Sequence, residues 1–190
     1  MARIPYRDGN ENAEVIALTA QIREERGQLH NLYRLLLNSP PVARGWLALL
    51  TAVRQQCILG SKFRELAILR IAIINGAEIE YTSHIPIALK EGVRQVQIDA
   101  LAEWQSANVF DAAELAVLAY TDAMTKDIQV PDNVFDALKP HFDARELTEL
   151  TVVNLRAHRA KPVAARWSHP ICGQIGPVDL RPDEASVVMR

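Results

Sequence analysis

The fold is decided by residues 61–92, which read SKFRELAILRIAIINGAEIEYTSHIPIALKEG. From Leu66 to Ile74 this stretch is apolar on nearly every side of a helix, a pattern typical of a helix buried on all faces. Ser61 is placed to cap the start of this helix, and Asn75-Gly76 favours its end. We therefore expect a central, buried helix, followed by a second helix that is ended by Gly92.

The rest of the chain repeats its apolar residues at helical rather than strand spacing, which predicts an all-α fold. The breaks between segments fall at Gly, Pro, Asn and Asp. Two segments begin with the Asp-x-x-Glu spacing of a capping box, at Asp111 and Asp143. Outside the central pair, the predicted helical segments are residues 13–26, 29–37, 42–57, 93–104, 115–124, 131–140 and 147–155.

The length of 190 residues suits one domain. We expect a single helical domain over residues 1–160 and an irregular tail over residues 161–190. The tail is rich in Pro and Gly, which argues against a regular helix there.

Composition excludes several classes of protein. The 21 Lys and Arg against 23 Asp and Glu leave a formal net charge of -2, which disfavours binding to nucleic acid or to a membrane surface. The longest apolar runs, such as Trp46–Leu50, fall far short of the roughly 18–20 residues that cross a bilayer. Cys57 and Cys172 form no Cys-x-x-Cys pair and are typical of reduced thiols. With no secretory signal at the start, we expect a soluble, cytoplasmic protein.

Two charged residues, Glu65 and Arg70, fall in or beside the most apolar helix. An unpaired buried charge costs several kcal/mol, so each must find a partner. One interpretation is structural, with each residue paired to a neighbouring helix or subunit. The other is catalytic, because burial raises the pKa of a carboxyl toward the range that is useful for proton transfer.

The next helix places Glu80, Tyr81 and His84 at spacings of three and four, so the three side chains can share one helical face. A carboxylate beside an imidazole fixes its tautomer and raises its basicity, as a general acid/base His requires. The alternative is that Glu80 and His84 only stabilise the helix. A metal site that adds Glu65 as a ligand is a further alternative, although no third His supports it.

The stretch from Phe63 to Gly92 resembles the carboxymuconolactone decarboxylase and alkylhydroperoxidase D-like superfamily. It has a similar order of arginine-glutamate, apolar helix, asparagine-glycine, acidic-aromatic segment and histidine. Weaker support lies in residues 31–33, 39–40, 118–122 and 145–150, so that the resemblance covers roughly residues 20 to 155. It implies an all-α, AhpD-like homo-oligomer, commonly a trimer or hexamer, with the site between helices or at a subunit contact.

In the peroxidase branch, the resemblance implies a centre made of a glutamate, a histidine and two cysteines. Glu65 matches the glutamate and His84 the histidine, but Ala77 and Glu80 fill the cysteine positions. Thiol chemistry needs a thiolate and a resolving partner, so we expect no peroxidase activity.

The decarboxylase branch does without those cysteines and implies cofactor-free loss of carbon dioxide from a carboxylated lactone. On that model His84 donates or shuttles the proton, Glu80 orients it, and Glu65 tunes or relays. Tyr81 is a candidate hydrogen-bond donor to a substrate oxygen. Arg70 is a candidate partner of a substrate carboxylate, although its helical position favours a structural ion pair. We expect no cofactor and no metal.

Three hypotheses about function follow. The first is an acid/base enzyme that acts on a small carboxylated lactone or a related carbonyl compound. The second is a non-catalytic or redox-inactive relative that binds a small ligand or a partner through the same pocket. The third, binding of nucleic acid or an acidic partner by the basic residues 156–169, is the least favoured, since four cations without a recognition motif usually form a solvated segment.

Overall fold

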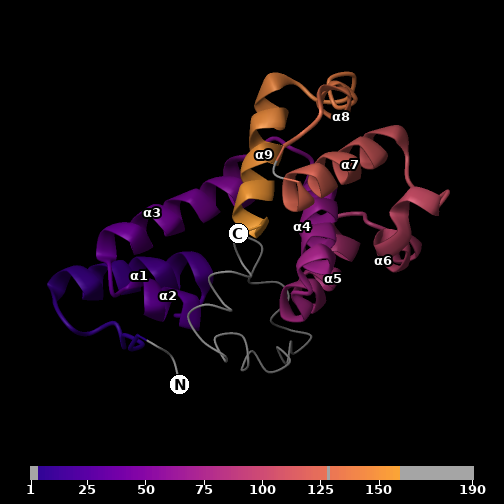
Figure 1. Ribbon diagram of the computed structural model, residues 1–190. Coiled ribbons are helices and arrows are strands. Elements are labelled where there is room, and N and C mark those ends of the chain that lie inside the picture. The colour runs from indigo at the N-terminus through magenta and orange to yellow at the C-terminus, as the bar shows by residue number, and fades with distance from the viewer. Residues whose placement is uncertain (1–3, 128, 159–190) are drawn as a thin grey trace.

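The computed structural model describes residues 4–127 and 129–158, and every regular element within them is helical (Figure 1). The predicted all-α fold is confirmed. The elements are α1 (Ala13–Arg26), α2 (Asn31–Leu36), α3 (Pro40–Thr51), the π-helix η1 (Ala52–Gln56), α4 (Ser61–Asn75), α5 (Glu78–Lys90), α6 (Gln95–Ala100), the 3-10 helix η2 (Leu101–Ser106), α7 (Ala112–Lys126), α8 (Asp132–Asp136) and α9 (Ala144–His158).

Helix α4 is the centre of the fold, as its sequence predicts. It packs against α5, α7 and α9, which surround it in Figure 1. Leu66, Ala67 and Leu69 are fully buried, although they point in different directions around the helix. Burying each leucine side chain stabilises the fold by about 1.5–3 kcal/mol. The apolar surface of α4 therefore anchors the residues that it carries in fixed positions.

Helices α1, α2 and α3 form a lobe with an apolar core of its own, built around Leu18, Ile22, Tyr33 and Leu47. Figure 1 shows this lobe beside the helices that surround α4. The π-helix η1 follows α3 directly and contacts α9, so it connects the lobe to the rest of the molecule. The predicted tail, residues 161–190, lies outside the described residues.

The helix ends show which local signals were correct. Asp111 and Glu114 exchange the two hydrogen bonds of a capping box at the start of α7, and Asp143 and Glu146 do the same before α9. Gly76 ends α4 in the left-handed conformation, with φ of 57°.

The prediction that Ser61 caps α4 is wrong. Gly60 occupies the cap position, and Ser61 is the first helical residue. The Ser61 hydroxyl instead donates to the carboxylate of Glu91, just after the end of α5. The start of α4 is thereby joined to the end of the neighbouring helix.

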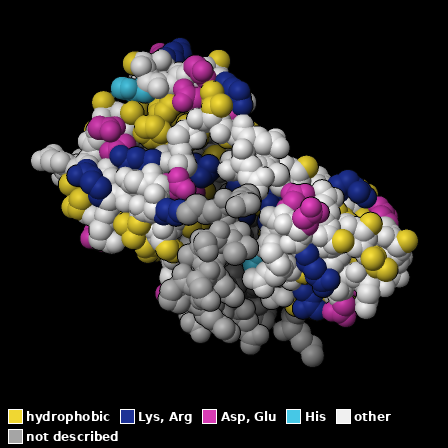
Figure 2. All heavy atoms as spheres, turned by 180° about the vertical axis from the view of Figure 1, so that it is seen from behind, with side chains coloured by type: hydrophobic (Ala, Val, Ile, Leu, Met, Phe, Trp, Pro, Cys, Tyr) yellow, Lys and Arg dark blue, Asp and Glu magenta, His cyan; other side chains and the backbone are white. Residues whose placement is uncertain are grey.

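Within the described part of the chain, none of the helices combines the length and the apolar character needed to cross a membrane. On the face shown in Figure 2, acidic and basic side chains are interspersed over the described residues.

Candidate active site

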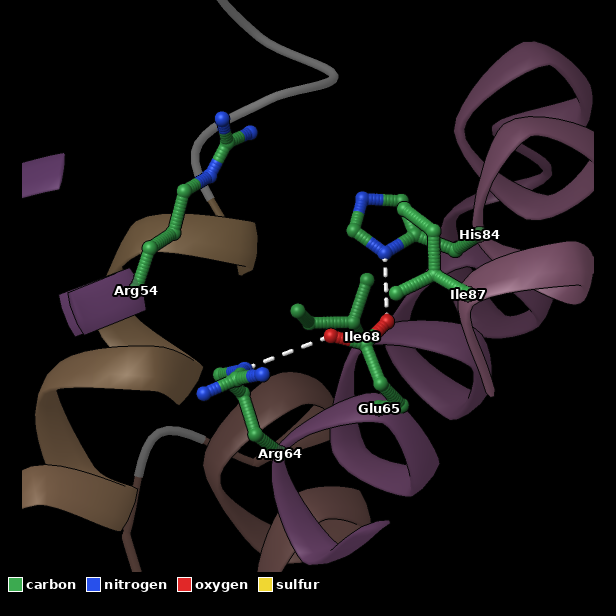
Figure 3. Close-up of a pocket in the computed structure, with 6 residues that line it drawn as sticks. All are labelled: Arg54, Arg64, Glu65, Ile68, His84 and Ile87. Atoms are coloured by element: carbon green, nitrogen blue, oxygen red, sulfur yellow. Dashed lines mark hydrogen bonds and ion pairs between the residues drawn. The ribbon is translucent and has the colours of Figure 1, made fainter. Parts of the chain in front are cut away.

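A pocket of about 220 Å³ opens between η1, α4 and α5 (Figure 3). Its lining combines charged or titratable side chains from all three elements with isoleucine side chains from α4 and α5. The lining residues are Arg54 from η1, Arg64, Glu65 and Ile68 from α4, and His84 and Ile87 from α5. The volume is below the roughly 300–1,000 Å³ of pockets for drug-sized ligands, so it suits a small molecule.

Helical spacing explains why these side chains meet. Glu65 and Ile68 are three residues apart on α4, and His84 and Ile87 are three apart on α5, so each pair lies on one face of its helix. The two helices pack against each other, with their facing surfaces held by the apolar core. As a result Glu65 is 2% exposed and His84 is 8% exposed.

The imidazole of His84 is held between two carboxylates. Its Nδ1 lies 2.7 Å from Oε2 of Glu65, which is a short hydrogen bond. Its Nε2 lies 3.4 Å from Oε1 of Glu80, one turn earlier on α5. The second oxygen of Glu65, Oε1, accepts a hydrogen bond from Nε of Arg64 at 3.3 Å. Both oxygens of Glu65 are therefore engaged, in the arrangement seen in Figure 3.

These contacts determine the charge on each group. Burial lowers the pKa of His84, but the hydrogen bonds and charges of Glu65 and Glu80 outweigh burial and raise that pKa above its ordinary value. Burial raises the pKa of Glu65, but His84 and Arg64 outweigh it and lower that pKa. The raised pKa expected for Glu65 is therefore wrong, because its partners stabilise the carboxylate more than burial disfavours it. The contacts therefore favour the imidazolium form of His84 and the carboxylate form of Glu65.

Such a pair can deliver and recover a proton. A protonated imidazole carries N–H on both nitrogens, and the one on Nδ1 is committed to Glu65. The other nitrogen faces Glu80, whose side chain is 35% exposed and can exchange protons with solvent. The site thus combines a buried imidazole with a partly exposed carboxylate beside it.

Arg70 does not belong to this site. Its guanidinium binds both carboxylate oxygens of Asp122 on α7, at 2.6 and 2.8 Å, and donates to the backbone oxygens of Leu101 and Ala102. All of this lies away from the pocket lining. The structure therefore removes Arg70 as a partner of substrate in this pocket and supports its structural interpretation, since an arginine buried to this extent requires a countercharge.

Tyr81 is also outside the pocket lining. Its ring packs with the apolar cluster that joins α4, α5 and α6, and its hydroxyl points to the backbone oxygen of Ile98 at 3.5 Å. Of the three residues expected to share one face, the structure brings Glu80 and His84 together and directs Tyr81 elsewhere. The phenol ring is drawn into the core because it offers a large apolar area.

Two lining residues, Arg54 and Arg64, were missed by the sequence interpretation. Arg64 precedes Glu65 directly, and this adjacency was a usable signal. Arg54 had none, because only the folded chain brings η1 against α4 and α5.

The proposed ligands do not converge on one point. Glu65 and Glu80 face opposite nitrogens of the His84 ring, so the three groups point at one another rather than at a shared centre. Among residues 4–127 and 129–158, no group of three His, Cys, Asp or Glu is arranged to hold a metal ion.

Comparison with known proteins reveals the relatives of this chain. The model of the carboxymuconolactone decarboxylase family matches residues 40–123, which include the whole pocket lining. A crystal structure of a protein of unknown function from Agrobacterium tumefaciens, proposed to be the antioxidant defence protein AhpD, is 27% identical. It covers 72% of this chain and 95% of its own, with a TM-score of 0.63. These matches support the resemblance of the chain to the carboxymuconolactone decarboxylase and AhpD-like superfamily, with residues 40–123 matching its family model.

Other similar proteins are less identical in sequence. The debrominase Bmp8, with a cysteine replaced by alanine and 2,3,4-tribromopyrrole bound, has a TM-score of 0.69. It is 15% identical and covers 88% of this chain and 91% of its own, a likeness that shows the shared fold alone. YdfG, an uncharacterized protein of Bacillus subtilis, is 24% identical over 101 residues, which are 52% of this chain and 69% of that protein.

The thiol of the described residues is not part of this site. Among the described residues the free cysteine is Cys57, which is half-buried and does not line the pocket. Burial, together with the charge of Glu149, raises the pKa of the Cys57 thiol, which disfavours the reactive thiolate. Cys172 lies outside the described residues.

Proposed function

We propose that this protein is a cofactor-free acid/base enzyme that removes carbon dioxide from a small carboxylated lactone or a related carbonyl compound. The observation that carries the proposal is the buried imidazole of His84, held by Glu65 at 2.7 Å on the wall of a small pocket. The match of residues 40–123 to the carboxymuconolactone decarboxylase family model supports the same reaction.

The reaction needs a place for an electron pair and a source for one proton. When the carbon–carbon bond to the carboxylate breaks, carbon dioxide leaves and its bonding electrons move into the conjugated carbonyl to form a dienolate. His84 then gives its proton to carbon, and the dienolate becomes the neutral product. Water returns one proton to His84 and releases hydroxide, so each turnover consumes one proton from solvent.

The three site residues take distinct roles in this proposal. His84 is the proton donor, and Glu65 is the positioning residue that holds its Nδ1 and keeps it charged. Glu80, looser at 3.4 Å and partly exposed, relays the proton from solvent. From the sequence, Glu80 was expected to orient the ring and Glu65 to tune it or relay a proton. In this proposal Glu65 positions and tunes the ring, and Glu80 relays the proton. The pocket cations provide the electrostatic stabilisation that a dienolate oxygen requires.

Peroxide reduction is disfavoured by the same residues. The positions that match the superfamily's two cysteines hold Ala77 and Glu80, which have no thiol. Cys57 is outside the pocket lining and its raised pKa disfavours attack on peroxide. Any dithiol-dependent reduction of peroxide by the purified protein would contradict this part of the proposal.

The test is carbon dioxide release from a panel of carboxylated lactones, measured with the wild type, His84→Gln and His141→Gln. His141 is an exposed histidine outside the pocket lining and serves as the matched control. We expect turnover in the wild type and the control and its loss in His84→Gln. Loss of a positioned general acid costs about 10²–10⁴-fold. Unchanged turnover in His84→Gln removes His84 from the mechanism. Ligand binding without turnover by any panel member favours the non-catalytic alternative.

A further inference from the structure

Arg64 shares the carboxylate of Glu65 with His84. Its Nε donates to Oε1 of Glu65 at 3.3 Å, while Nδ1 of His84 lies 2.7 Å from Oε2. Figure 3 shows the guanidinium and the imidazole on either side of this carboxylate, and both groups line the pocket. One buried carboxylate therefore fixes the positions of the guanidinium and the imidazole relative to each other.

The guanidinium of Arg64 can donate more hydrogen bonds than Glu65 accepts from it. It carries five N–H groups in a rigid plane, and the bond from Nε uses one of them. Among residues 4–127 and 129–158, its two terminal nitrogens have no hydrogen-bond acceptor. The side chain is 13% exposed, so it stays close to the pocket instead of extending into solvent. The terminal N–H groups can therefore serve an acceptor that enters the pocket.

The chemistry of the proposed reaction supplies such an acceptor. When carbon dioxide leaves, its bonding electrons move into the conjugated carbonyl, and negative charge collects on the carbonyl oxygen. Hydrogen-bond donors that are already in place stabilise an oxygen of this kind most strongly. An arginine side chain does not give up its protons in proteins, so it can hold this oxygen without protonating it. His84, which can release a proton, then serves the carbon.

We propose that Arg64 is the oxyanion-binding residue of this pocket. Its terminal N–H groups hold the carbonyl oxygen of the substrate, on which the charge of the dienolate collects, while His84 gives its proton to carbon. The electron pair of the dienolate forms the new carbon–hydrogen bond, and the oxygen becomes a neutral carbonyl again. This inference rests on the proposed function, because it names the group that stabilises the intermediate of that reaction.

The experiment compares two flat probes, 4-nitrophenolate and nitrobenzene. The first carries a negative oxygen conjugated to its ring, as a dienolate does, and the second lacks that oxygen. Binding is followed by NMR titration of the methyl resonances of Ile68 and Ile87, which line the pocket. The proteins are the wild type, Arg64→Gln, Arg64→Lys and Arg44→Gln, and circular dichroism verifies the helices of each. Arg44 is an exposed arginine of α3 that pairs with Glu14 outside the pocket lining, so Arg44→Gln is the matched control.

We expect the wild type and Arg44→Gln to bind 4-nitrophenolate more tightly than nitrobenzene. Arg64→Gln should weaken 4-nitrophenolate by about tenfold or more, the range for a lost hydrogen bond to a charged group, and leave nitrobenzene unchanged. Arg64→Lys should recover part of the loss, because it keeps the charge and loses the planar fork. Equal weakening of both probes in Arg64→Gln, or unchanged 4-nitrophenolate affinity, would overturn the proposal. If Arg64→Gln loses its helices, Arg64→Lys decides, and wild-type affinity for 4-nitrophenolate in that variant is the contrary result.

The pKa of His84 separates direct binding by Arg64 from an effect that is passed on through Glu65. Arg64 lowers the pKa of Glu65, and in Arg64→Gln the carboxylate keeps His84 as its partner. Removing a positive charge beside an imidazolium does not lower the pKa of that imidazolium. We therefore expect the NMR titration of His84 to stay in place or move to higher pH, while 4-nitrophenolate binding weakens. A His84 pKa that falls in Arg64→Gln would place the effect on the imidazole and overturn the proposal.

The kinetics of carbon dioxide release give a second readout. Because the charge on the oxygen develops only in the transition state, Arg64→Gln should lower kcat by about 10²–10³-fold with little change in KM. A raised KM with an unchanged kcat would mean that Arg64 holds the substrate before it reacts, which contradicts the proposal. Absence of any shift by 4-nitrophenolate in the wild type also overturns it.

Failure of this inference is distinguishable from failure of the proposed function. If Arg64→Gln binds 4-nitrophenolate normally while His84→Gln loses turnover, only the assignment of Arg64 fails. If Arg64→Gln loses 4-nitrophenolate while His84→Gln turns over normally, the oxyanion site stands and the acid/base assignment fails.

Discussion

Replacing Glu65 by Gln separates the charge of this side chain from its shape. The carboxylate is 2% exposed and lies 2.7 Å from Nδ1 of His84, so it is the main reason that the imidazole stays protonated in a buried position. Gln has nearly the same volume and can still accept a hydrogen bond from Nδ1. With the negative charge gone, burial again acts to lower the pKa of His84, and only Glu80 opposes it.

The size of the effect follows from the change of a charged acceptor to a neutral one. A hydrogen bond to a charged group contributes about 1.5–3 kcal/mol and a neutral one about 0.5–1.5 kcal/mol, so the imidazolium of His84 loses about 1–1.5 kcal/mol of stabilisation. We therefore expect the pKa of His84 to fall in Glu65→Gln, with a change of roughly tenfold in its protonation equilibrium. The measurement is a pH titration of histidine side chains by NMR, with the His84 resonance assigned by its absence from His84→Gln.

The matched control is Glu24→Gln, which removes an exposed carboxylate of α1 outside the pocket lining. It should leave the His84 titration unchanged. A His84 pKa that stays the same or rises in Glu65→Gln would refute the reasoning, because it would mean that Glu65 does not hold the imidazolium.

Three other predictions concern stability and assembly. The pKa of His84 is raised in the folded state, so its protonation stabilises the fold at low pH, and this stabilisation is lost as pH rises through the folded-state pKa of His84. The pKa of Glu65 is lowered in the folded state, so its ionisation stabilises the fold at higher pH, and this stabilisation is lost as pH falls through the folded-state pKa of Glu65. The free energy of unfolding in urea should therefore include the stabilisation by the Glu65–His84 pair only at pH values between the folded-state pKa of Glu65 and that of His84. The same pH dependence should be absent in Glu65→Gln. Asp122→Asn leaves the buried Arg70 guanidinium without its countercharge, so unfolding free energy should drop by about 3–5 kcal/mol, and a drop under 1 kcal/mol would contradict the structural role. Val42 is one of several large apolar side chains exposed on the described helices, and light scattering should report a trimer or hexamer, with a monomer at micromolar concentration as the contrary result.

The features of the fold that could be predicted are those determined by residues close together in the sequence. The capping boxes at Asp111 and Asp143 are local, so their spacing alone was sufficient. Helix α4 could be placed at the centre because its apolar residues surround the axis. The proximity of Glu65 and His84 was also predictable, since consecutive helices joined by a short turn pack side by side.

What could not be predicted depends on tertiary contacts. Arg70 pairs with Asp122, which is 52 residues away in sequence. No local pattern near either residue predicts this pair. Tyr81 is three residues from His84, which rotates it by only about 60° around the helix. That rotation is nevertheless enough to direct the ring to the cluster with α6 while His84 faces Glu65. Arg54 enters the pocket through a π-helical turn, whose sequence, AVRQQ, reads as an ordinary helix end.

The central claim is that His84 acts as a proton donor whose charge is maintained by Glu65. It is tested most directly by the pH dependence of kcat for carbon dioxide release, compared between the wild type and Glu65→Gln. We predict that the rate falls as pH rises through the pKa of His84, and that in Glu65→Gln this fall moves to lower pH by the same amount as the NMR titration of His84. An alkaline limb at the same pH in both proteins would contradict it.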